Sequence, residues 1–76
     1  MYDFPNRLRH LREINGMDRK EFAAKINASV STISRYENNK MVPTLETARL
    51  IANIFGTTLD WLAGDGNLED YKGEMQ

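Results

Sequence analysis

Apolar residues recur every three or four positions along five short stretches of the chain, which is the spacing of helices with one buried face. In the first stretch Leu8, Leu11 and Ile14 share one side, while charged residues fill the other. Pro5 suits the first turn of a helix, and Asn15-Gly16 suits its end. The pattern predicts an amphipathic helix between these two signals.

The second predicted helix has the clearest start signal in the chain. Asp18 can accept hydrogen bonds from the first unpaired amides, and Glu21, three residues later, can reach back to the amide of Asp18. Met17 can pack across this cap onto Phe22. These signals predict a helix of about two turns over residues 19–26.

A short turn leads from this helix to the next. Asn27 tolerates the left-handed conformation that ends a helix, and Ser29 is a good cap for a new one. The third helix is predicted over residues 30–38, with Ile33 and Tyr36 on its apolar side. A three-residue turn between two short helices is the spacing of a helix-turn-helix.

A proline and a threonine mark the start of a fourth helix. Pro43 blocks continuation of the preceding turn, Thr44 can cap the new helix, and Gly56 ends it. Its apolar residues are expected to face inward: Leu45, Ala48, Ile51, Ala52 and Phe55.

Thr57 or Thr58 can cap a short fifth helix that completes a domain over residues 1–64. The remaining residues are rich in acid and show weak periodicity. We therefore expect a flexible acidic tail over residues 65–76, with at most one helical turn at Leu68–Tyr71. No strand pattern competes, so the predicted fold is all-α, a compact five-helix domain with a helix-turn-helix at helices 2 and 3.

Length and composition narrow the function. A chain of 76 residues has room for one domain with a modest core, which excludes a large enzyme fold. Cysteine is absent and His10 is the only histidine, so no disulfide and no cluster of cysteine or histidine ligands can form, and we expect no metal and no cofactor. No apolar run approaches the roughly 20 residues of a membrane helix, and the start lacks a signal-peptide pattern. We expect a cytoplasmic protein with no membrane partner.

The net charge of −1 gives no support for a nucleic-acid partner, but the charge is unevenly distributed. Residues 1–40 hold eight basic and five acidic side chains, whereas residues 41–76 hold two basic and six acidic ones. Such a division fits a chain with one half turned toward phosphates. It also fits ordinary solvated surfaces, so the division alone decides little.

Five stretches together carry a more specific pattern: Arg7–Arg12, Gly16–Ala23, Ser29–Glu37, Pro43–Thr47 and Leu59–Leu62. With them the chain resembles the phage-repressor type of helix-turn-helix, also called the XRE or Cro-like family. Each stretch alone is weak, but the combination is highly specific. The resemblance implies a lambda-repressor-like domain that binds double-stranded DNA as a transcription regulator, a repressor bound to a palindromic operator as a homodimer.

The resemblance places Val30, Ser31, Ser34 and Arg35 in the major groove. Val30 can touch a thymine methyl group, and either serine can bond a base or a phosphate. Arg35 can pair with O6 and N7 of guanine, and we regard it as the strongest candidate. Without the surrounding motif, a solvated arginine on an exposed helix would be the better interpretation.

Phosphate contacts are implied for Arg19, Asn38 and Lys40, and more weakly for Thr32. Relatives commonly carry glutamine where this chain has Arg19. A fixed cation therefore replaces an amide that can both donate and accept, which favours phosphate binding.

Arg12 and Glu37 correspond to a pair that forms a salt bridge in relatives and ties the first helix to the end of the third. If formed here, the pair would orient Arg12 toward a phosphate. The alternative is two surface charges that contribute roughly 0–1 kcal/mol. Asn27 and Asn39 stand where glycine is usual, and both turns are still expected because asparagine adopts the left-handed region.

Leu59, Trp61 and Leu62 are interpreted as core or as a dimer contact, since relatives often pair through this end of the domain. An alternative function is an antitoxin or adaptor module that holds a regulatory protein partner, with the acidic half after Met41 as its surface. The serines lack a positioned base and a nucleophile-elbow motif, so we do not expect an enzyme.

Overall fold

Side-chain caps start four of the helices at the predicted places. In the computed structural model, which describes residues 3–73, Asp18 Oδ1 accepts from the Glu21 amide at 2.8 Å while Glu21 Oε1 accepts from the Asp18 amide at 3.0 Å. Ser29, Thr44 and Thr58 cap the three following helices through their hydroxyl oxygens. Each cap satisfies an amide that the first turn of a helix leaves unpaired.

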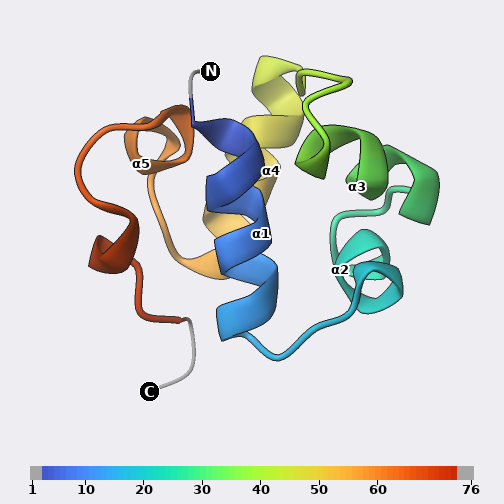
Figure 1. Cartoon of the computed structure of the whole chain (residues 1–76), viewed down its shortest axis with the longest axis horizontal. Coiled ribbons are helices and arrows are strands. Elements are labelled where there is room, and N and C mark those ends of the chain that lie inside the picture. Colours follow the sequence, from blue (N-terminus) through green and yellow to red (C-terminus); the bar gives the residue numbers. More distant parts are fainter. Residues whose placement is uncertain (1–2, 74–76) are drawn as a thin grey trace.

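The predicted all-α fold with five helices is confirmed. The described residues form α1 (Phe4–Ile14), α2 (Arg19–Lys25), α3 (Val30–Glu37), α4 (Leu45–Phe55), α5 (Leu59–Ala63) and a 3₁₀ turn, η1 (Leu68–Asp70). In Figure 1, α1 lies in front of α4, with α2 and α3 on one side and α5 on the other. Within residues 3–73, no helix is long and apolar enough to span a membrane.

Both asparagine turns form as predicted. Asn27 has a φ of 56° and Asn39 a φ of 59°, in the left-handed region that ends a helix. The amide of Ala28 then donates to the Ala23 carbonyl at 2.8 Å, and the amide of Lys40 donates to the Arg35 carbonyl at 2.8 Å. These bonds fix the chain direction directly after α2 and after α3.

The core lies between α1, α4 and the helix-turn-helix. Phe22 of α2 stacks on Phe55 of α4, with ring centroids 4.7 Å apart, and Phe4 of α1 meets Tyr36 of α3 edge to face at 5.5 Å. Leu45 was expected inward but is 59% exposed, because it is the first residue of α4 and lies beyond the buried middle turns of that helix.

Arg7 is a core residue, although it was expected among the charged residues on the outer side of the first helix. Its Nε donates to Asp3 Oδ2 at 2.8 Å, and its guanidinium carbon lies 5.0 Å from the centroid of the Trp61 ring. Its two Nη groups donate at 2.9–3.2 Å to four carbonyl oxygens, those of Trp61, Gly64, Asp65 and Gly66. All five N–H groups are used, so Arg7 fixes the end of α5 against α1.

The segment after α5 lies on the same side of α1 as α5 (Figure 1), and its Tyr71 joins the core cluster. Tyr71 is buried, its hydroxyl accepts from Asn15 Nδ2 at 3.0 Å, and its carbonyl lies 3.0 Å from His10 Nε2. This packing differs from the flexible tail expected from residue 65 onward, because the aromatic ring supplies the apolar area that the acidic residues lack. The end of that expected tail, residues 74–76, lies outside the described residues.

Candidate nucleic-acid interface

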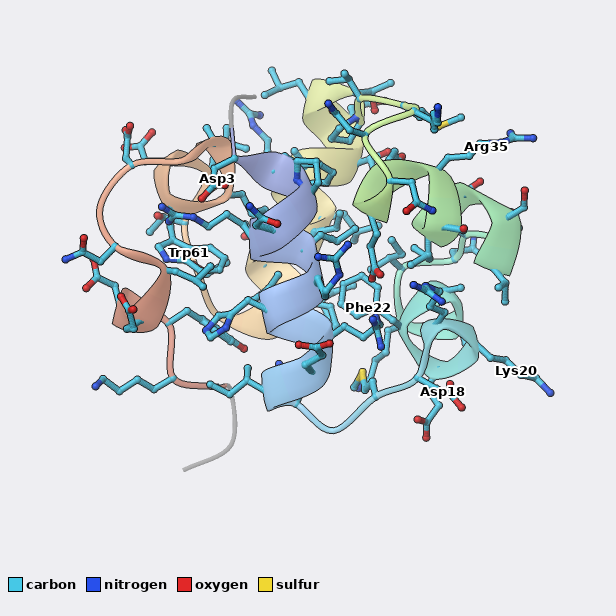
Figure 2. All side chains as sticks on the ribbon, in the orientation of Figure 1. Asp3, Asp18, Lys20, Phe22, Arg35 and Trp61 are labelled. Atoms are coloured by element: carbon cyan, nitrogen blue, oxygen red, sulfur yellow. The ribbon has the colours of Figure 1, made fainter. Side chains whose placement is uncertain are left out.

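The outer side of α3 carries the four residues predicted to contact bases. Val30, Ser31 and Arg35 are exposed and Ser34 is half-buried, while Ile33 on the opposite side is fully buried. Figure 2 shows Arg35 extending away from α1 into solvent. Within residues 3–73 the Arg35 guanidinium has no ion-pair partner, so its donors are available to a ligand.

A tightly packed junction holds α3 in place on α2. Ala23, Phe22 and Ile26 of the α2 segment are buried in one apolar cluster with Ile33 of α3. A larger side chain at position 23 would have to displace its packed neighbours. The exposed side of α3 is therefore presented by a rigid support rather than by a mobile loop.

The predicted ion pair between Arg12 and Glu37 is present. Arg12 Nε donates to Glu37 Oε2 at 2.7 Å and Arg12 Nη2 donates to Oε1 at 3.1 Å, which is bidentate geometry. These hydrogen bonds raise the pKa of Arg12 above its usual value against the opposing effect of burial. Arg12 Nη1 also donates to the Met17 carbonyl at 3.2 Å, so one side chain joins α1, α3 and the turn before α2.

Two further arginines reach the same carboxylate, which the sequence did not indicate. Arg19 Nε donates to Glu37 Oε1 at 3.2 Å. Arg9 Nη2 donates to the Glu37 carbonyl at 3.1 Å, and Arg9 Nε lies 3.8 Å from Oε1. The Glu37 side chain is fully buried beneath these groups. The only available signal was the recurrence of arginine on one side of the first helix, at positions 9 and 12.

The remaining residues predicted to contact phosphate lie around the two ends of α3. Asn38 and Lys40 are exposed just after it, whereas Thr32 is half-buried and its hydroxyl accepts from Ser29 within the N-terminal cap at 3.0 Å. Lys20, which had no predicted role, is exposed on α2 and extends on the same side of the molecule as Arg35 (Figure 2). Basic side chains thus lie near the exposed side of α3.

An apolar groove of about 370 Å³ lies where the start of α4 meets α5. Its apolar walls come from Val42, Pro43, Leu45, Ala48, Leu59 and Ala63. Of the residues predicted for dimerisation, Leu59 lines this groove, but Trp61 and Leu62 are buried in the core of the single chain and offer little surface to a second copy. Among residues 3–73, no three His, Asp or Glu side chains are grouped so that they could hold a metal ion.

Comparison with known proteins agrees with this geometry. Residues 8–62 match a family model described as helix-turn-helix. Over 71 residues the chain is 32% identical to a protein of Haemophilus influenzae named as an uncharacterized HTH-type transcriptional regulator. The matched stretch is 92% of this chain and 28% of that relative, so the chain spans less than a third of the relative's length. No solved structure matches the chain.

Proposed function

The chain belongs to the helix-turn-helix family, of the phage-repressor type. From this premise we propose that it is a sequence-specific transcription regulator that represses by binding a palindromic operator as a homodimer. Helix-turn-helix domains place their second helix in the major groove, where each base pair presents a distinct pattern of donors and acceptors. The observation that carries the proposal is the exposed side of α3, where Arg35 has no ion-pair partner among residues 3–73, while Ile33 on the opposite side is fully buried.

The exposed side chains of α3 are suited to contact only a few base pairs directly. Arg35 pairs with O6 and N7 of a guanine through two N–H donors, Val30 packs on a thymine methyl group, and Ser31 and Ser34 bond a base or a phosphate. Arg19, Asn38 and Lys40, with Thr32 and Arg12, hold the phosphates on either side and so fix the register of α3.

The apolar groove supports the homodimer part of the proposal. Val42 is 66% exposed and Leu45 is 59% exposed, and both line the groove together with Leu59. Complete burial of a valine or leucine contributes about 1.5–3 kcal/mol, and two-fold symmetry uses each residue twice. A dimer formed here presents two copies of α3 to half-sites about 34–36 Å apart.

Selection of duplexes from a random pool, followed by a salt titration on the selected site, tests the proposal. We expect a palindromic motif and a log-log dependence of affinity on salt with a slope near −0.9 for each phosphate neutralised. A pool that yields no motif and a salt-independent affinity would contradict it. That result would favour instead an antitoxin or adaptor module, in which the acidic half of the chain binds a protein.

A further inference from the structure

We propose that Arg9, Arg12 and Arg19 form one anion site around the buried carboxylate of Glu37, and that this site holds a single phosphate of the DNA backbone. The proposal rests on the proposed function, in which Arg12 and Arg19 already contact phosphates, and it adds Arg9, to which the family resemblance gives no role. Arg9 lies on α1, as Arg12 does.

The cluster has donors to spare. A guanidinium carries five N–H groups. Arg12 uses one N–H group on each of its three nitrogens. Arg19 uses only the N–H of Nε, toward Glu37, and Arg9 uses one N–H of Nη2, toward the Glu37 carbonyl. The side chains of Arg9 and Arg19 are 38% and 45% exposed, so several of their remaining donors can reach a ligand from solvent.

The cluster also has charge to spare. Three cations surround the one carboxylate of Glu37, which forms ion pairs with all of them. Guanidinium groups bind phosphate oxygens through paired N–H donors, a geometry that a lysine lacks. An incoming phosphate therefore supplies the second anion that the three arginines lack.

The position of the cluster suits a backbone phosphate. Arg9 bonds the carbonyl of Glu37, the residue directly before Asn38, and Arg12 bonds the carbonyl of Met17, two residues before Arg19. The site thus includes Arg19, the predicted phosphate contact on α2, and adjoins Asn38, a predicted phosphate contact after α3. Because Glu37 holds the guanidinium groups before DNA arrives, little side-chain freedom is lost on binding.

Arg9→Gln tests the site, with Arg49→Gln as the matched control, since Arg49 is exposed on α4 and has no role in the proposed interface. Because Arg12 and Arg19 still face the phosphate, we expect Arg9→Gln to reduce the magnitude of the salt slope by up to about 0.9, and to weaken binding by up to about eightfold at 0.1 M salt, equally for every sequence. Arg49→Gln should leave the slope unchanged. Circular dichroism confirms that both variants are folded.

A duplex series in which one phosphate at a time is replaced by neutral methylphosphonate identifies the contact. At one position the replacement should weaken the wild-type chain more than it weakens Arg9→Gln, a difference that a merely structural role for Arg9 does not produce. An unchanged slope in Arg9→Gln, or equal sensitivity of both chains at every phosphate, overturns this proposal alone. If the wild-type chain binds no duplex at all, the proposed function fails first, and this contact with it.

Discussion

Replacing Glu37 with glutamine removes the single negative charge that three arginines share, with almost no change in volume. The Glu37 side chain is fully buried, so water cannot take over its role. The amide keeps one acceptor oxygen, but its NH₂ group faces a guanidinium N–H that also donates. At least one charge-assisted hydrogen bond is therefore lost, and three cations stay close together.

The magnitude of this loss follows mainly from Arg12, which is only 13% exposed. A hydrogen bond to a charged group contributes about 1.5–3 kcal/mol, and breaking a buried ion pair by removing one partner costs about 3–5 kcal/mol. Arg9 and Arg19 are more than a third exposed, so solvent screens their share. We expect Glu37→Gln to lower the free energy of unfolding by about 2–4 kcal/mol.

Urea denaturation followed by circular dichroism measures this change, with Glu69→Gln as the control because Glu69 is exposed in η1. A domain of this size has a free energy of unfolding of about 4–11 kcal/mol, so a loss of about 2–4 kcal/mol leaves the variant folded over most of that range and lowers its melting temperature by roughly 8–32 °C. A change of less than about 0.5 kcal/mol would refute the reasoning, since it would put the cluster among ordinary surface ion pairs.

Two further predictions concern other parts of the fold. The hydrogen bond from Arg7 lowers the pKa of Asp3, so the stability that this pair contributes is present above the usual aspartate pKa, about 3.9, and is lost as the pH falls through the lower folded value. The melting temperature of Asp3→Asn should therefore lie below that of the wild type at pH 7, and the difference should shrink below about pH 4. An equal difference at all pH values would refute the pairing. Leu45→Asp should shift the chain toward monomer in sedimentation at micromolar concentration. Leu50→Asp, at an exposed site on α4 outside the groove, should leave the oligomeric state unchanged. Equal behaviour of the two variants would rule out the groove as the dimer interface.

Local signals predicted most of the fold. Three kinds of signal each act within about four residues: the capping box of Asp18 and Glu21, the left-handed asparagines and the threonine caps. A short stretch of sequence therefore contains both partners of each capping hydrogen bond. Apolar spacing identified the buried sides of the helices for the same reason. It failed for Leu45, because spacing does not show that a residue at the first turn extends past the core.

The contacts that could not be predicted join residues far apart in the chain. Arg7 bonds carbonyls 54–59 residues away, and Tyr71 meets His10 and Asn15 across 61 and 56 residues. A helical pattern treats a charged position as solvated, and it gives no sign that backbone carbonyls at the end of another helix will surround it. Only the pair of Arg12 and Glu37 was foreseen, through the resemblance to the family.

The most direct test of the central claim compares the motif selected by the wild-type chain with the motif selected by Arg35→Ala. If α3 reads the major groove, the variant should lose its preference at one base pair of each half-site, with a cost of about 1–3 kcal/mol on the original site, and keep its preferences elsewhere. Identical motifs and equal affinities for the two chains would contradict the assignment of α3 as the reading helix through Arg35.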